Sequence, residues 1–138
     1  MAGYSGRSTV QKLGIKPGFR IFADGLSKGY REIVGDLPTE VVIASRLKAP
    51  LDLVHLFATK LAGLQEKLLI CRDAIAPDGM IWVSWPKKSS RVATDLSETV
   101  IRDTTLPLGL VDIKVCAIDE VWSGLKFVIP KNQRAKAR

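Results

Sequence analysis

The sequence predicts an α/β fold: a mostly parallel sheet with helices on both faces and an antiparallel hairpin at its C-terminal end. Segment 51–88 reads LDLVHLFATKLAGLQEKLLICRDAIAPDGMIWVSWPKK. An apolar run, a helical periodicity, a Pro-Asp-Gly turn and a second apolar run are the order of a strand, a crossover helix and a parallel strand. Segments 111–116 and 121–129 both have strand character, and the four residues between them are too few for a crossover, which predicts an antiparallel pair.

The N-terminal half supplies two further strands and two short helices. Ser8 is placed to cap a helix that ends at Gly14, and the turn Lys16-Pro17-Gly18 leads into a first strand at 20–23. Ser27 is placed to cap a second helix that ends before Gly35. Segment 39–44, TEVVIA, is apolar on both faces, which predicts a central parallel strand.

The second half supplies the remaining strands and helices. A third strand is expected at 53–57 and a fourth at 80–85. The intervening helix carries one apolar stripe, formed by Leu61, Leu64, Leu68, Cys71 and Ile75. Thr94 or Asp95 is expected to cap a last helix that reaches Thr105.

Length and charge point to one domain with a basic tail. The chain has 138 residues with 46% hydrophobic and 25% charged residues, enough for a core without disulfides. We expect a single domain at 1–130 and a disordered tail at 131–138. The formal charge is +7, but the tail carries four basic residues and no acid, so the body has 17 basic and 14 acidic residues, or +3. A nucleic-acid partner is therefore not expected for the body of the protein, although the basic tail does not exclude one.

The sequence gives no sign of export, membrane insertion or a metal site. No stretch approaches the ~20 apolar residues of a membrane span, and the N-terminus lacks a signal-peptide core. A cytoplasmic location without a membrane partner is the expectation. Cys71 and Cys116 lie in apolar patterns that predict buried thiols, and with one histidine they make no metal set. That histidine, His55, is interpreted as a core residue, with a general base as the alternative.

Candidate ligand-binding residues follow the predicted parallel strands at their carboxyl ends, where open α/β sheets bind ligands. They are Asp24, Gly25, Lys28 and Gly29 after the first strand, Ser45 and Arg46 after the second, Thr59 after the third, and Lys87, Lys88 and Ser89 after the fourth. Convergence of Lys28, Arg46, Lys87 and Lys88 would create an anion site. The alternative is that these cations are solvated loop residues.

Three tryptophans are an unusual number for this length. Trp82 and Trp85 are three apart on one strand, so they face opposite sides of the sheet. One interpretation is that all three pack in the core. The other is that Trp85 and Trp122 form an aromatic surface for a protein partner.

The order of LGIKPGFRIFADG, DLVHLF, a Pro-Asp-Gly turn and a closing hairpin resembles Rossmann-like S-adenosylmethionine methyltransferases. The blocks GYSG, KLGIK, WVSWPKK and GLVDIKVCAIDEVWSGLKFV are similar to an uncharacterised bacterial family of short methyltransferase-like proteins. The resemblance covers residues 3–129 and implies a truncated methyltransferase-type sheet. It carries no established activity.

This chain departs from working methyltransferases at the cofactor positions. Gly25 and Gly29 are four residues apart with a leucine and a lysine between them, and Ser45-Arg46 stands where a ribose-binding carboxylate is usual. The third strand ends in Phe57-Ala58-Thr59, without the acceptor-binding Asn/Asp-Pro-Pro-aromatic motif. We therefore expect a binding or interaction module with no catalytic residues and no cofactor, whose partner is a phosphate-bearing ligand or a protein. The alternatives are a divergent S-adenosylmethionine-dependent methyltransferase and a nucleotide- or phosphate-ligand-binding protein.

Overall fold

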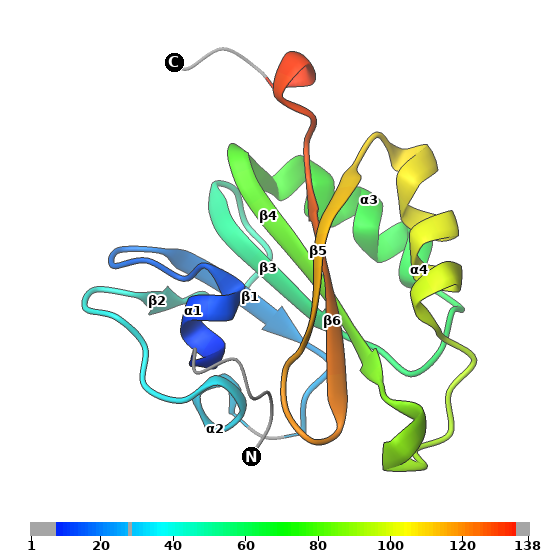
Figure 1. Cartoon of the computed structure of the whole chain (residues 1–138). Helices are drawn as coiled ribbons and strands as arrows, with labels where there is room; N and C mark the ends of the chain where they lie inside the picture. Colours follow the sequence, from blue (N-terminus) through cyan, green and yellow to red (C-terminus); the bar gives the residue numbers. More distant parts are fainter. Residues whose placement is uncertain (1–7, 28, 135–138) are drawn as a thin grey trace.

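One six-stranded sheet organises the chain, in the order β2-β1-β3-β4-β6-β5 (Figure 1). The computed structural model describes residues 8–27 and 29–134. The strands are β1 (Arg20–Asp24), β2 (Val42–Ile43), β3 (Leu51–Phe57), β4 (Ile75–Pro86), β5 (Val111–Ala117) and β6 (Trp122–Val128). The first four run parallel, and β6 is antiparallel to both β4 and β5. The predicted α/β class and the closing antiparallel pair are confirmed.

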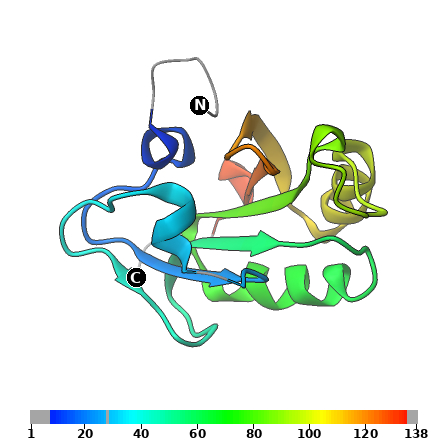
Figure 2. The same ribbon diagram turned by 90° about the horizontal axis from the view of Figure 1, so that it is seen from below.

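Helices cover both faces of the sheet, as predicted (Figure 2). They are α1 (Thr9–Leu13), α2 (Tyr30–Val34), α3 (Leu64–Ala74) and α4 (Glu98–Thr105), with single 3-10 turns η1 (Lys88–Ser90), η2 (Leu106–Leu108) and η3 (Lys131–Gln133). α1 and α2 pack on one face, and α3 and α4 pack on the other. Within the described part of the chain, no helix has the length and apolarity needed to cross a membrane.

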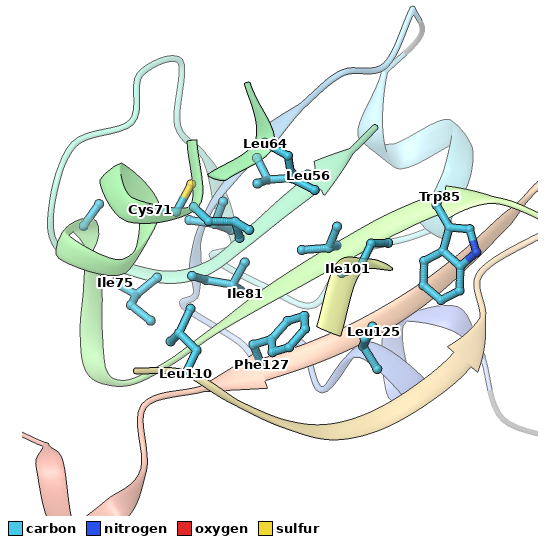
Figure 3. Close-up of a cluster of buried hydrophobic side chains, with 14 of the residues drawn as sticks. Leu56, Leu64, Cys71, Ile75, Ile81, Trp85, Ile101, Leu110, Leu125 and Phe127 are labelled. Carbon is cyan, nitrogen blue, oxygen red and sulfur yellow. The ribbon is translucent and has the colours of Figure 1, made fainter. Parts of the chain in front are cut away.

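Three residues of the predicted apolar stripe lie on α3 and build the core beneath it (Figure 3). Ile75, the last residue of the predicted stripe, instead begins β4. Leu64, Leu68 and Cys71 are at most 2% exposed and pack against Leu56 of β3 and Ile81 of β4. Burying each such side chain contributes about 1.5–3 kcal/mol. Leu61, the first residue of the predicted stripe, is 39% exposed because α3 begins only at Leu64.

The opposite face holds a second apolar cluster under α1 and α2. Trp82 is fully buried there, and its indole Nε1–H donates to the carbonyl oxygen of Leu13 over 3.1 Å. Trp85 belongs to the cluster under α3 and α4, so the prediction that Trp82 and Trp85 face opposite sides is confirmed. Neither Cys71, which is buried, nor Cys116, which is half-buried, forms a disulfide.

The prediction of a central strand at 39–44 is wrong. Only Val42 and Ile43 are extended, and they form an edge strand that pairs with β1 alone. Glu40 has a left-handed backbone (φ 62°), which interrupts an extended run at that point. Val42 is 46% exposed, so an apolar sequence here covers one side of the sheet edge rather than filling the sheet centre.

Helix starts are only partly as predicted. Ser8 caps α1 with a full capping box, and Gly14 ends it with a left-handed backbone (φ 78°). Gly29 rather than Ser27 stands at the start of α2, and Ser97 rather than Thr94 or Asp95 caps α4. Those last two residues contact the end of β3 instead, as described below.

Two lysines face each other across β5 and β6 on the side of α1. Lys114 is paired directly opposite Lys126, and the Lys114 ammonium donates to the carbonyl oxygen of Lys12 over 2.9 Å. Partial burial, followed by the charges of Lys114 and Lys16, lowers the pKa of Lys126. Among residues 8–27 and 29–134, no acidic side chain forms an ion pair with any of these lysines.

Replacing Lys126 with methionine is expected to stabilise the fold. The change removes a half-buried like-charge pair and keeps an unbranched side chain over the sheet, which should raise the free energy of unfolding by about 0.5–1 kcal/mol. Urea unfolding at neutral pH measures the difference. The matched control, Lys88→Met, removes an exposed lysine and should change stability by less than about 0.5 kcal/mol. A destabilised K126M protein would contradict the expectation.

Candidate functional site

The strand order reverses between β1 and β3. From β1 the chain first adds β2 on one side and then returns to add β3 on the other. In open α/β sheets, ligands bind beyond the carboxyl ends of the strands at such a switch point. Here the end of β1 brings Asp24, and the end of β3 brings Phe57 and Ala58, to a shared crevice that Lys60 and Lys67 also line. The predicted site residue Asp24 therefore lies at the switch point.

An ion pair spans the mouth of this crevice. Lys67 of α3 donates from Nζ to Oδ2 of Asp24 over 2.8 Å. The two side chains are 58% and 39% exposed, and an ion pair of such exposure stabilises a fold by about 0–1 kcal/mol. The contact can therefore open at little cost.

Gly25 follows Asp24 directly, in the turn after β1. Its backbone is left-handed (φ 92°), and a Cβ atom at this position would lie 1.9 Å from the carbonyl oxygen of Phe57. The turn after β1 thus lies directly on the end of β3, a close approach that only glycine permits. The resulting crevice has a volume of about 40 Å³.

The other predicted site residues do not converge on this crevice. Ser45 and Arg46 line a separate concavity beside β2, whereas Lys87 and Lys88 follow β4. Since β1 and β3 lie between β2 and β4 in the sheet, the predicted anion site that joins Arg46 to Lys87 and Lys88 is not formed. Lys28, the remaining member of that set, lies outside the described residues.

Thr59 and the residues after β4 form hydrogen bonds that join neighbouring loops. The carbonyl oxygen of Thr59 accepts from the Thr94 hydroxyl over 2.6 Å and from the Asp95 amide over 3.2 Å. The Lys87 amide donates to the carbonyl oxygen of Val121 over 2.7 Å, and Ser89 is exposed in η1. The loop that follows β4 is thereby tied across the end of β3, where ligands of α/β sheets commonly sit.

The two tryptophans proposed as a partner surface are not exposed together. Trp85 is 8% exposed in the cluster under α3 and α4 (Figure 3). Trp122 is half-buried on the opposite face, with its ring edge-to-face against Phe57 at a centroid distance of 5.1 Å. The core interpretation holds for Trp85, so an aromatic surface that joins Trp85 to Trp122 is excluded.

A buried polar chain crosses the sheet face under α2. The Tyr30 hydroxyl is 2.7 Å from Nδ1 of His55, and Nε2 of His55 is 2.7 Å from the Ser84 hydroxyl. The His55 ring stacks on Phe57 at 4.1 Å. Burial lowers the pKa of His55 to about 3 and raises that of Tyr30.

His55 is therefore the core histidine that the sequence predicts. A neutral imidazole has one donor and one acceptor nitrogen, so two hydroxyls satisfy it completely. His55 and Ser84 are fully buried, so neither side chain is exposed to a ligand in this structure. The sequence offered no signal for the partners, because Tyr30 and Ser84 lie 25 and 29 residues away in the chain. Among the described residues, no group of three or more His, Cys, Asp or Glu side chains could hold a metal ion.

The strand order, the closing antiparallel pair and the crevice at the β1–β3 switch define a Rossmann-like fold of the S-adenosylmethionine-dependent methyltransferase type. No protein-family model matches the chain, and no curated protein matches it by sequence. A TehB-like S-adenosylmethionine-dependent methyltransferase from Corynebacterium glutamicum is similar in structure, with a TM-score of 0.56 and 13% identity over 88% of each chain.

Two further solved structures are similar. An S-adenosylmethionine-dependent methyltransferase from Aquifex aeolicus aligns with a TM-score of 0.60 and 14% identity over 87% of each chain. Fibrillarin from Aeropyrum pernix, solved with natively bound S-adenosyl-L-methionine, aligns with a TM-score of 0.51 and 16% identity over 87% of this chain and 73% of that one. The expectation of no cofactor is wrong on this comparison, since two of these neighbours are S-adenosylmethionine-dependent methyltransferases and the third contains bound S-adenosyl-L-methionine.

The crevice does not accommodate that cofactor in the conformation described. Pockets for small molecules and cofactors usually measure about 300–1,000 Å³, and this one measures about 40 Å³. Asp24 already engages Lys67, and the Gly25 turn lies on Phe57. Binding of a cofactor at the switch point therefore requires a wider crevice than the one described.

Proposed function

We propose that the protein is a divergent S-adenosylmethionine-dependent methyltransferase whose cofactor site is the crevice at the β1–β3 switch. The observation that carries this proposal is the placement of Asp24 and the left-handed Gly25 at the carboxyl end of β1, beside the end of β3. Acidic and glycine residues at that point suit a nucleoside ligand, because the backbone can approach it closely and a carboxylate accepts its hydroxyl or amino protons.

The weakness of the ion pair at the mouth supports the proposal that the crevice can open to admit a ligand. Among the described residues, the side chain of Asp24 is paired with Lys67, through a contact exposed to water. A ligand that accepts a hydrogen bond from Lys67, or donates one to Asp24, would replace this contact without leaving a buried charge.

Titration calorimetry with S-adenosylhomocysteine tests the site. We expect micromolar binding by the wild-type protein and a loss of affinity of about tenfold or more in Asp24→Asn, since one charge-assisted hydrogen bond contributes about 1.5–3 kcal/mol. Asp73→Asn is the matched control, because Asp73 is an exposed carboxylate whose nearest cation, Arg72, is 3.9 Å away. Equal affinity in Asp24→Asn and the wild type would place the ligand elsewhere. Absence of heat at millimolar ligand would refute the proposal.

A non-catalytic binding module is the second candidate function. It is favoured by the small volume of the crevice and by the position of Ser45 and Arg46, which place no carboxylate after β2. Transfer of a labelled methyl group from S-adenosylmethionine to acceptors in a broad screen separates the two. Turnover supports the enzyme, whereas cofactor binding without turnover supports the module.

A further inference from the structure

β2 forms one free edge of the sheet (Figure 1). A basic concavity lies beside it. We call it the β2 edge pocket. Its lining consists of Arg20, residues 42–46 and Lys48, and its volume is about 340 Å³. No acidic residue contributes to the lining.

Strand geometry explains why three cations meet there. Arg20 and Val42 are paired across β1 and β2, so their side chains share one face of the sheet edge. After β2 the chain turns sharply, with the Lys48 amide donating to the carbonyl oxygen of Arg46 over 3.0 Å. Arg46 and Lys48 of this turn line the same concavity as Arg20.

The positive charges are not neutralised within the described part of the chain. None of Arg20, Arg46 and Lys48 forms an ion pair with a residue in 8–27 or 29–134. Asp52 is the one carboxylate recorded in contact with any of the three among these residues, and it accepts from the backbone amide of Arg20 over 2.8 Å. The guanidinium and ammonium groups are exposed and available to a ligand.

Backbone and hydroxyl donors add to the cations. The Val42 amide donates to the carbonyl oxygen of Phe19, just before β1, over 2.9 Å, and the Ala44 amide donates to the carbonyl oxygen of Ile21 in β1 over 2.7 Å. Because alternate residues of a strand point their amides in opposite directions, the Ile43 amide faces the open edge. Ser45, which is exposed, follows two residues after Ile43. The pocket is thus rich in donors and positive charge, which suits a multivalent oxyanion.

We propose that the β2 edge pocket binds the phosphate group of a phosphate-bearing ligand, either a free nucleotide-type phosphate or the backbone of a single-stranded nucleic acid. Arginine guanidinium groups match the oxygen geometry of phosphate, and the lysine ammonium adds charge. The site lies on the far side of β1 from the crevice.

Charge reversal with a matched control tests the site. Arg46→Glu with Lys48→Glu changes the pocket by four charges, and Lys87→Glu with Lys88→Glu makes the same change at the end of β4. With a fluorescent single-stranded RNA as probe, we expect the first double variant to bind about tenfold or more weakly and the second less than about threefold more weakly. Each phosphate contact contributes about 0.7 to the salt slope, so loss of two should make it shallower by about 1.4.

A second measurement identifies the source of the phosphate. Amide chemical shifts of Ile43 and Ser45 are followed as inorganic pyrophosphate is added to the wild-type protein. Shifts with pyrophosphate indicate a small phosphate ligand, and shifts with RNA alone indicate a nucleic-acid backbone; both support the pocket. Binding of neither probe, or equal weakening in the two double variants, would overturn the proposal. Melting curves for both variants verify that each remains folded.

Discussion

Replacing His55 with alanine is expected to lower the free energy of unfolding by about 3–5 kcal/mol. Two effects add. The ring is removed from beneath α2 and from its stack on Phe57, which leaves a cavity that the surroundings cannot fill. The Tyr30 and Ser84 hydroxyls also lose their partner while buried, at a cost of about 1–3 kcal/mol each before relaxation. Urea unfolding monitored by tryptophan fluorescence measures the loss.

Two smaller substitutions separate hydrogen bonding from packing. Tyr30→Phe and Ser84→Ala each remove one hydroxyl and leave one ring nitrogen of His55 unsatisfied in the core. Each should cost about 1–3 kcal/mol. A loss of less than about 1 kcal/mol in His55→Ala would contradict the prediction. So would unchanged stability in both hydroxyl variants, because the polar chain would then not stabilise the packing of α2 on the sheet.

His55 also gives stability a defined pH dependence. Its pKa is about 3 in the folded protein and 6.5 in the unfolded chain, so below pH 6.5 the unfolded chain binds the extra proton. Stability from this group is therefore fully present above pH 6.5 and is lost as the pH falls toward 3, by up to about 1.4 kcal/mol per pH unit. In His55→Gln the decline between pH 6.5 and 5, above the range of most carboxyl groups, should disappear. An unchanged decline in that variant would refute the assignment.

Replacing Gly25 with alanine should be the second most damaging change. Its Cβ would meet the carbonyl oxygen of Phe57 at 1.9 Å, in a backbone conformation (φ 92°) that alanine disfavours. The turn must then leave the end of β3, for which we expect a loss of about 3–5 kcal/mol. Thermal and urea unfolding measure it.

Gly18→Ala is the matched control for the cost of placing alanine in a left-handed backbone conformation. Gly18 has nearly the same φ (80°), but nothing lies within 4 Å of the position of its Cβ. It should cost only about 1–2 kcal/mol, the price of a left-handed alanine. The difference between the two variants isolates the contact between the Gly25 turn and β3. Equal losses of stability in the two variants would show that moving the Gly25 turn away from Phe57 costs no free energy.

Local patterns predicted those elements whose partners are close in sequence. The spacing of Leu64, Leu68 and Cys71 identified the buried face of α3, because an amphipathic helix shows its stripe without reference to its partner. Ser8 identified the start of α1 through an interaction spanning three residues. The antiparallel pair β5–β6 followed from the short connection alone.

Placement in the sheet was beyond the sequence. An apolar β-branched run such as 39–44 suits a central strand and an edge strand equally well, and only the pairing of β2 with β1 alone decides between them. The predicted anion site was wrong for the same reason, because it also depended on the order of the strands. Ser45, Arg46, Lys87 and Lys88 all follow strands, but their mutual distance depends on which strands are neighbours.

The sequence by itself therefore determined the α/β class, the apolar face of α3, the antiparallel closing pair and the position of Asp24 and Gly25 after the first strand. All of these depend on contacts or periodicities within a few residues. The tertiary structure alone decided the edge position of β2, the grouping of Arg46 with Arg20 and Lys48, and the joining of Tyr30, His55 and Ser84. These depend on strand order and register, which are set by the packing of the whole sheet against its helices.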